Sequence, residues 1–200
     1  FNGYSQVDFI VSSAGFSTTS IPVGGTTNFL TFISINETSA GGELAPGCLD
    51  VIISFPASGS YKPTGGAAAV AMTGFGPSFT WVYSAIDNAL YGNNIVTLAD
   101  GDGGLITVNV TGFSLVSNGV TSSNASDALN CSNTNSGDND GESASLSVTA
   151  PLPVKLSGFK TRSIDCEGIQ LNLTTESEIN SKDFNVERSL DGKEFEKVAF

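Results

Sequence analysis

The sequence predicts an all-β chain whose larger part folds as an antiparallel sandwich. Its first 150 residues contain short β-rich segments separated by Gly, Ser, Asn and Pro, and no window has the sustained 3.6-residue apolar spacing of an amphipathic helix. Several short strands with turn signals between them are typical of a sandwich. The expected strands cover residues 4–11, 27–35, 49–55, 79–84, 94–98, 105–116 and 143–149.

Two segments between these strands have other patterns. Residues 67–72 are compatible with a single helical turn. Residues 117–141 consist almost entirely of Ser, Asn, Thr, Asp and Gly. Such a composition, over this length, predicts a long surface loop.

A domain boundary is expected at Ala150-Pro151-Leu152-Pro153, where two prolines favour an extended linker. Residues 1–150 form the sandwich, and residues 151–200 form a second module. In that module the expected strands cover residues 155–164, 168–175, 183–189 and 194–200, with a tight Asp-Gly turn between the last two. A sandwich of this kind normally has about seven strands, so the second module looks incomplete.

The charge and the missing histidine exclude several classes of function. The chain has 8 basic and 20 acidic residues, a net charge of −12, and Lys62 is the only basic residue of the first 150. Phosphate backbones and anionic headgroups would repel it, so we expect no nucleic-acid partner and no membrane insertion. Without histidine, the usual base of nucleophilic catalysis is missing. We therefore predict that the chain is not an enzyme.

The three cysteines, Cys48, Cys131 and Cys166, have no metal-binding spacing. In an exported protein, Cys48 and Cys131 are a candidate disulfide that would tie the loop at 117–141 to the sandwich and add about 2–4 kcal/mol. The alternative, free thiols, stays open. A catalytic cysteine is rejected because no imidazole is present to lower its pKa.

Two acidic turns are candidates for a calcium site, and calcium is the only cofactor that the sequence suggests. Calcium takes six to eight oxygen ligands, and alternating carboxylates on a Gly-containing turn supply several of them. Neither turn has the complete EF-hand spacing, and solvated turns are the favoured interpretation. The candidate ligands are Asp100 and Asp102 in the first turn, and Asp138, Asp140 and Glu142 in the second.

Alternation in residues 79–84 places Phe79, Trp81 and Tyr83 on one face of a strand. An exposed aromatic row could stack on sugar rings, but a row buried in the core is the favoured interpretation. Tyr61 and Tyr91 are expected to be more exposed, because Gly and Pro lie near them. The candidate glycan-stacking residues are Tyr61, Trp81 and Tyr83.

Four segments in residues 20–150 carry the first resemblance to a known family. They are IPVGGTTNFLTF (21–32), ISFPASG (53–59), LADGDGGLITVNVT (98–111) and DNDGESASLSVT (138–149). Their order is similar to the immunoglobulin-like repeats of bacterial surface proteins, which tend to run VGxxxxYTITVxN, LPAG, AGGxxxxTVTV and DNNxASxxxV. The resemblance implies an immunoglobulin-like sandwich for residues 1–150.

The second resemblance covers residues 151–200 and is sharper. LPVKLSGF (152–159), QLNLTTESEINS (170–181) and DFNVERSLDGKEF (183–195) follow one another. This series resembles the fibronectin-III-like module near the C-termini of proteins exported by the bacterial type IX secretion system, except that Asn172-Leu173 replaces the usual aromatic step. The resemblance implies a partial fibronectin-III-like sandwich, export across the outer membrane, and an extracellular or bacterial cell-surface location.

An incomplete module exposes strand edges, which can accept a strand from a neighbouring molecule. The alternating N-terminal residues Val7, Phe9 and Val11 are the candidate donor strand, and head-to-tail insertion would build a filament. The alternative, a chain that is a cut piece of a longer one, is favoured.

Together these features predict a non-enzymatic exported surface protein with a structural or adhesive role, as a stalk, filament subunit or adhesin segment. Its expected partners are further copies of itself, a surface glycan or a protein ligand. Two alternatives stay open: a carbohydrate-binding module, and an accessory fragment of a larger secreted hydrolase.

Overall fold

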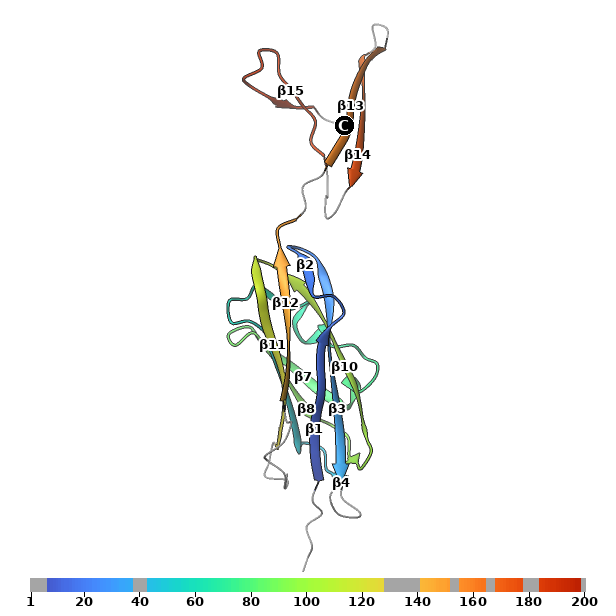
Figure 1. Cartoon of the computed structure of the whole chain (residues 1–200), viewed down its shortest axis with the longest axis vertical. Coiled ribbons are helices and arrows are strands. Elements are labelled where there is room, and N and C mark those ends of the chain that lie inside the picture. Colours follow the sequence, from blue (N-terminus) through green and yellow to red (C-terminus); the bar gives the residue numbers. More distant parts are fainter. Residues whose placement is uncertain are drawn as a thin grey trace, which may run out of the picture. The chain divides into compact units, whose positions relative to one another are not determined.

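The computed structural model describes residues 7–37, 43–127, 141–151, 155–164, 168–177 and 184–198. The chain forms two compact units, residues 1–150 and 151–200 (Figure 1). None of the residues in the described ranges belongs to a helix long and apolar enough to cross a membrane.

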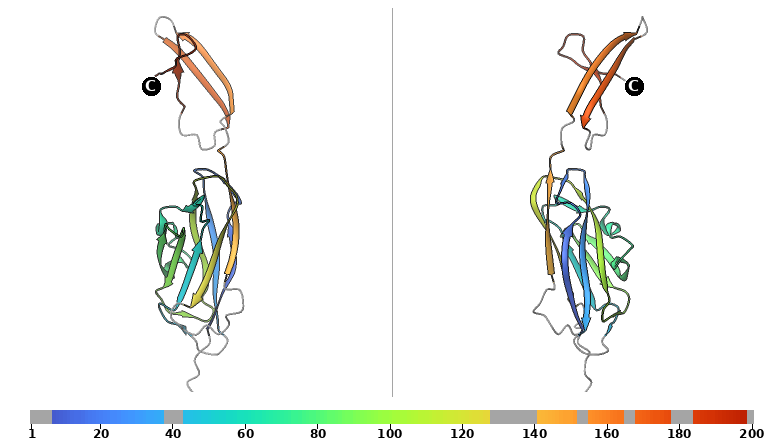
Figure 2. Two further views of the ribbon diagram at one scale, coloured as in Figure 1. Left: turned by 90° about the vertical axis from the view of Figure 1, so that its left-hand side faces the viewer. Right: turned by 45° about the vertical axis from the view of Figure 1, so that its right-hand side comes forward.

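The first unit is a sandwich of two sheets, as the sequence predicts. One sheet has four strands in the order β1 (Val7–Phe16), β3 (Thr26–Glu37), β10 (Gly103–Gly112) and β6 (Tyr61–Pro63). The other has six, in the order β2 (Ser20–Pro22), β12 (Gly141–Thr149), β11 (Val116–Asp127), β5 (Leu49–Ser54), β8 (Ala89–Asn94) and β7 (Phe79–Ser84). Pairing is antiparallel except between β12 and β2. Figure 2 shows β3 and β10 side by side.

Four further short elements lie in the described part of the unit. β4 (Glu43–Leu44) pairs with β9 (Leu98–Ala99), and two single-turn helices cover Gly66–Ala69 (η1) and Gly76–Ser78 (η2). The first of these overlaps the residues where a helical turn is predicted. Both are 3-10 turns, which suits connections of this length.

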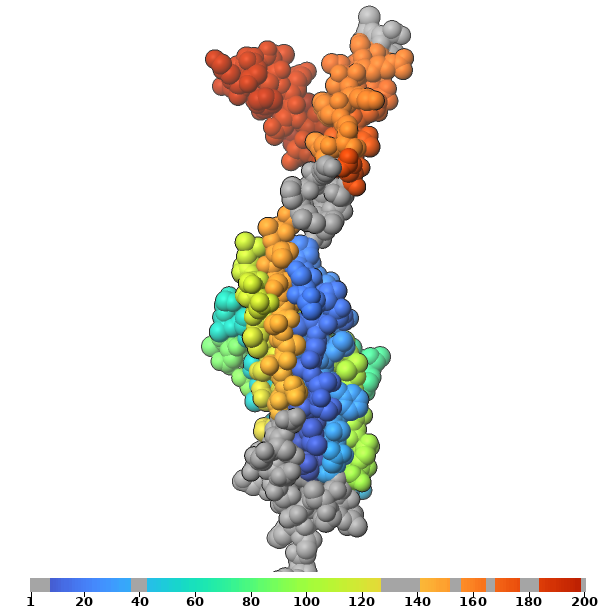
Figure 3. Space-filling view, viewed as in Figure 1, coloured from blue at the N-terminus to red at the C-terminus, as the bar shows by residue number. Residues whose placement is uncertain are grey.

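Alternation along the strands builds the core between the two sheets. Leu49, Val51 and Ile53 of β5 are fully buried, while the residues between them are partly exposed. Phe29 and Ile33 of β3 face them from the other sheet and are also fully buried. Because side chains alternate between the two faces of a strand, each sheet supplies one apolar face to the core. Figure 3 shows β12 lying between its partner β11 and β1 of the opposite sheet.

The predicted loop at residues 117–141 is wrong in its first half, where β11 is a twelve-residue strand. β11 pairs with β12 on one side and β5 on the other, so it lies inside the sheet. Its core-facing side chains are small or hydroxylated: Thr121 and Ser123 are fully buried and Ala125 nearly so. The sequence conceals this strand because its buried residues are not large apolar ones.

The strand predicted at residues 94–98 is also displaced. The structure places β8 at Ala89–Asn94, and residues 95–97 connect it to β9. The side chain of Asn94 explains the end of β8. Its amide donates to the carbonyls of Ala45 and Val96, both at 2.9 Å, and its oxygen accepts the Leu49 N–H at 2.8 Å. The predicted set also omitted the short strand β6.

The candidate donor strand, residues 7–11, is part of β1 of its own unit, and its insertion into a neighbouring molecule stays a prediction. β1 pairs with β3 over its whole length, and Val7 lies opposite Glu37. Phe9 and Val11 are fully buried in the core of their own unit. Withdrawing this strand would uncover that core, so it is not an accessory arm.

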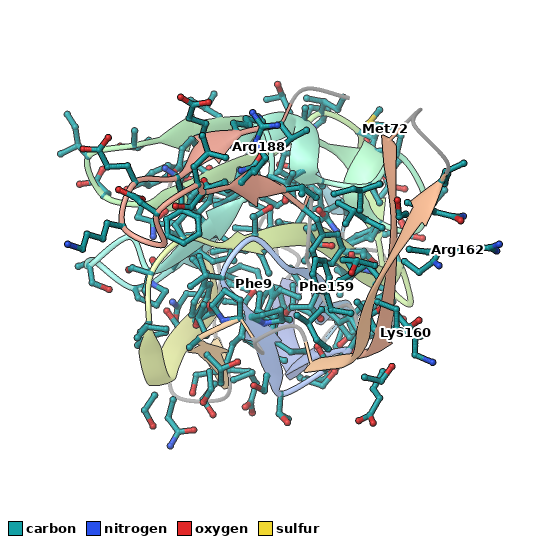
Figure 4. The ribbon with its side chains drawn as sticks, turned by 90° about the horizontal axis from the view of Figure 1, so that it is seen from above. Phe9, Met72, Phe159, Lys160, Arg162 and Arg188 are labelled. Atoms are coloured by element: carbon teal, nitrogen blue, oxygen red, sulfur yellow. The ribbon has the colours of Figure 1, made fainter. Side chains whose placement is uncertain are left out.

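The second unit consists of two two-stranded sheets. β13 (Lys155–Ile164) pairs with β14 (Gly168–Ser177), and β15 (Glu187–Arg188) pairs with β16 (Glu196–Lys197). Lys160 and Arg162 project on one side of β13, and Phe159 on the other (Figure 4). The predicted Asp-Gly turn joins β15 and β16, and the Asp191 carboxylate accepts the N–H groups of Lys193 and Glu194. These hydrogen bonds lower the pKa of Asp191.

Candidate binding face on β5, β8 and β7

The outer face of the six-stranded sheet carries an apolar row across three neighbouring strands. Ile52 of β5 lies opposite Tyr91 of β8, which in turn lies opposite Val82 of β7. Val82 is 62% exposed and Tyr91 is 39% exposed, whereas Ile52 is half-buried, so the row faces solvent mainly through Tyr91 and Val82. It lies on regular strand pairs, which fix its spacing to that of the sheet.

Polar side chains border this row on both sides. Asp50, Asn93 and Thr80 form the next row of the same face, and the Asn93 amide donates to the Asp50 carboxylate at 2.8 Å. On the other side, in the turn between β7 and β8, Asp87 accepts the Tyr91 hydroxyl at 3.2 Å and the Ser84 hydroxyl at 2.8 Å. The apolar centre therefore has an ordered polar rim.

The face is hollowed where these rows meet. A shallow hollow of about 190 Å³ is lined by Asp50, Ile52, Thr80, Val82, Tyr91 and Asn93 together with the backbone of Val51 and Gly92. The pKa of the Tyr91 phenol is raised by desolvation, and also by the charge and the hydrogen bond of Asp87. Tyr91 consequently stays neutral, as a hydrogen-bond donor to Asp87, well above pH 7.

The opposite side of β7 and β8 faces the core and holds this sheet edge in place. Phe79 is buried, and Trp81 and Tyr83 are half-buried and pack against the core. The Trp81 indole N–H donates to the Gly76 carbonyl at 3.0 Å, and the Tyr83 hydroxyl donates to Asn88 at 2.8 Å. These contacts agree with the interpretation of the row as core rather than as a sugar platform.

Tyr61 is fully buried, and the expectation that it is exposed is wrong. Its hydroxyl donates to the Gly119 carbonyl at 2.5 Å and accepts the Thr121 hydroxyl at 3.0 Å. Burial raises the pKa of Tyr61. A ring in this position cannot stack on a ligand. Tyr61 lies in β6, the edge strand of the four-stranded sheet, and its side chain is directed into the core.

A second hollow, of about 440 Å³, lies at one end of the sandwich. Tyr83 contributes one wall of it, together with Gly66 and Asn88. Lys62 and Phe113 line it as well, and the Lys62 ammonium lies 4.3 Å from the centre of the Phe113 ring. Tyr83 is the predicted sugar-stacking residue that lines this hollow.

The structure describes three of the five candidate calcium ligands, Asp100, Asp102 and Glu142. The Asp102 carboxylate accepts the Ala99 N–H at 2.7 Å, which closes the turn before β10, and Asp100 is exposed in the same turn. Glu142 is half-exposed in β12. Asp138 and Asp140 lie outside the described residues. Within the described part of the chain, no three acidic or cysteine side chains are grouped closely enough to hold a metal ion.

Cys48 is buried at the start of β5 and is disulfide-bonded. The two other cysteines, Cys131 and Cys166, lie outside the described residues. The pairing of Cys48 with Cys131 therefore stays a prediction.

The residues of the exposed row were not among the predicted site residues. Tyr91 was expected to be exposed, but β8 was displaced, so its alignment with Ile52 and Val82 was not predicted. One signal for this strand is present in the sequence. Leu90, Gly92 and Asn94 alternate with Tyr91 and Asn93, so an aromatic ring and an amide point outward. Pairing with β5 and β7 is long-range and cannot be read from that segment alone.

No protein-family model and no curated protein matches the chain. Its fold is similar to solved structures of low identity. They include a cohesin module from a Clostridium perfringens family 33 glycoside hydrolase (13% identity, TM-score 0.42, 74% of this chain and 98% of that one). They also include the RrgA Jo.In complex (7%, TM-score 0.36, 74% and 81%) and AvmM, described as catalysing macrocyclization in alchivemycin A biosynthesis (11%, TM-score 0.36, 76% and 92%). These proteins differ in what they do, and the likeness concerns the fold.

Proposed function

We propose that this chain is a non-enzymatic, exported cell-surface protein with an adhesive role, and that it binds a protein partner through the outer face of β5, β8 and β7. The observation that carries the proposal is the exposed row formed by Ile52, Tyr91 and Val82. An apolar centre with a polar, hydrogen-bonded rim is the composition of a protein interface. Export, by the type IX route, rests on the resemblance of residues 151–200.

The row needs a functional explanation because the fold does not require it. β5, β8 and β7 bury their other faces in the core, and the outward positions contribute little to that core. Exposed apolar side chains next to one another on a regular sheet mark an interaction surface more often than scattered single ones do.

A selection experiment tests the proposal. A phage library displaying random twelve-residue peptides is selected on the immobilised full chain, and each clone is then scored on two variants. Val82→Gln places a neutral polar side chain in the row. Val120→Gln makes the same change on β11, where Val120 is 57% exposed but outside the row.

We expect most clones to bind Val82→Gln at least tenfold more weakly than wild type, and to bind Val120→Gln as well as wild type. Clones that bind all three proteins equally would place the binding surface elsewhere and overturn the proposal.

Carbohydrate binding is the second candidate, because Tyr91 is an exposed ring on a flat sheet face. An array of purified neutral and acidic glycans, read with wild type and Tyr91→Ala, tests it. Retention of a glycan by wild type and its loss in Tyr91→Ala would favour a carbohydrate-binding module over a protein-binding one.

A further inference from the structure

The apolar row is bordered by a carboxylate on each side. Asp87 accepts the Tyr91 hydroxyl directly. Asp50 is the cross-strand partner of Asn93, two residues beyond Tyr91 on β8, and lines the same hollow as the Tyr91 ring. Diagonal neighbours at this spacing are within reach of a long side chain. A group placed over Tyr91 therefore has a negative charge on either side.

Within the described part of the first unit, neither carboxylate is paired with a basic side chain. Lys62 is the only basic residue of residues 1–150, which carry a net charge of −10. Its ammonium lies over Phe113. Asp87 accepts hydrogen bonds from Ser84 and Tyr91, which are neutral donors, and Asp50 accepts one from the neutral amide of Asn93. The carboxylates are thus held in place without being neutralised.

The ring between them suits a cation. A positively charged side chain is attracted to the face of an aromatic ring. The Tyr91 hydroxyl donates a hydrogen bond to the Asp87 carboxylate, which increases the electron density of the ring and strengthens that attraction. Ile52 and Val82 lie on either side of the ring in the row and offer an apolar surface for the methylene stem of Lys or Arg.

The size of the hollow limits what enters it. At about 190 Å³ it is smaller than the roughly 300–1,000 Å³ of typical small-molecule sites. It has room for one side chain of a partner. The charge of the whole unit would also attract a basic partner from a distance and repel an acidic one.

We infer that the partner of this face is a basic protein surface, which places an Arg or Lys side chain over Tyr91 between Asp50 and Asp87. The inference rests on the proposed function, because it names the chemistry of the partner that the same face binds.

The selected peptide clones test this inference separately from the function. Clones that lose binding on Val82→Gln should be enriched in Arg and Lys relative to the unselected library. Synthetic peptides of these sequences should bind at least tenfold more weakly when the anchoring Arg or Lys is replaced by Gln. Their affinity should also fall steeply with added NaCl, since the charges are exposed.

Two pairs of variants locate the effect on the protein. Asp50→Asn with Asp87→Asn keeps acceptors for Asn93, Ser84 and Tyr91 but removes both charges, and should weaken binding about tenfold. Glu43→Gln with Glu142→Gln removes two charges from the same unit outside the hollow, and should change affinity less than twofold. Tyr91→Leu should weaken binding severalfold. Tyr91→Phe should weaken it less, because the ring remains and only the hydrogen bond to Asp87 is lost.

The outcomes separate the two claims. If clones need Val82 but lack basic residues, or ignore the loss of Asp50 and Asp87, the face binds protein and the inference of a basic partner is overturned. If clones bind independently of Val82, or if only glycans bind, the proposed function and the inference both fall.

Discussion

The Trp81 indole occupies the space in front of Gly92 where any other residue would carry its side chain. The two residues are cross-strand partners on β7 and β8. A Cβ atom on Gly92 would come within 2.6 Å of the six-membered ring of Trp81, closer than atoms can approach. Gly92 thus lets Trp81 lie flat against β8 on the core side, under the strands that carry Val82 and Tyr91.

We therefore expect Gly92→Ala to lower the free energy of unfolding by about 1–3 kcal/mol, because the indole must shift from a well-packed position. Urea unfolding followed by Trp81 fluorescence measures it. Gly15→Ala is the matched control, since Gly15 also lies in a strand but a Cβ atom added to it would have no other atom within 4 Å. Equal stability of the two variants would contradict the role given to the contact.

Removing one buried hydroxyl should destabilise the region between the sheets. Tyr61→Phe leaves the Gly119 carbonyl without its donor and the Thr121 hydroxyl without its acceptor, both in the core. We expect a loss of about 1–3 kcal/mol, the usual cost of unsatisfied buried polar groups. Thermal unfolding by circular dichroism measures this loss.

The control is Tyr91→Phe, which removes an exposed hydroxyl and should change stability by less than about 0.5 kcal/mol. Combining Tyr61→Phe with Thr121→Val should cost less than the sum of the single changes, because the two hydroxyls bond each other. Additive losses would argue against the pair.

Tyr61 and Thr121 also show why part of the fold could be predicted from the sequence and part could not. β5 is a short run rich in Val, Ile and Leu, and the prediction placed it to within one residue. β11 buries Thr121 and Ser123 at positions where an apolar residue is expected. The buried Thr121 hydroxyl is satisfied because it donates a hydrogen bond to the Tyr61 hydroxyl. Neither segment alone predicts that β11 is a buried strand, because the contact that satisfies it joins residues sixty positions apart.

The candidate face could not be predicted for the same reason. Ile52, Tyr91 and Val82 come from three separate strands, and their alignment depends on the register of two strand pairs. Hydrophobic alternation predicts that a strand exists and which way its side chains point. It does not predict which outward residues of different strands become neighbours.

Alkaline pH should destabilise the protein through Tyr61. Burial raises its pKa above 10, so the folded state keeps the phenol proton at a pH where the unfolded chain releases it. This contribution leaves stability unchanged below about pH 10 and lowers it as pH rises from there to the raised pKa. Urea midpoints measured from about pH 8 to about pH 11.5 should fall more steeply for wild type than for Tyr61→Phe. Parallel curves would exclude Tyr61 as the cause.

Asn88 should be one of the least replaceable polar residues of the first unit. It has a positive φ of 49° and is buried in the turn before β8. Its amide donates to the carbonyls of Pro56 and Tyr61, at 2.8 and 3.1 Å, and its oxygen accepts the Tyr83 hydroxyl. Asn88→Gly keeps the backbone conformation but removes all three hydrogen bonds, so we expect a loss of about 2–3 kcal/mol.

Asn118 provides the comparison, because it has nearly the same φ, 51°, but is exposed. Asn118→Gly should change stability by less than about 0.5 kcal/mol. A similar loss in both variants would mean that the greater freedom of glycine in the unfolded chain, and not the lost hydrogen bonds, causes the destabilisation.

The disulfide of Cys48 should link it to Cys131. Leu49, the next residue, pairs with Asp127 at the end of β11, and Cys131 follows only four residues later. Four residues span up to about 14 Å, which is long enough for the chain to bring Cys131 to Cys48. Such a bond would fix the residues that follow β11 to the start of β5 and contribute about 2–4 kcal/mol.

Peptide mapping of the oxidised protein by mass spectrometry should recover a peptide containing Cys48 linked to one containing Cys131. Cys131→Ser should lower the melting temperature as much as reduction of wild type does, because each change removes the same cross-link. Cys166→Ser should leave that temperature unchanged. Recovery of a Cys48–Cys166 link, or destabilisation by Cys166→Ser alone, would show that the bond joins the two units of the chain instead.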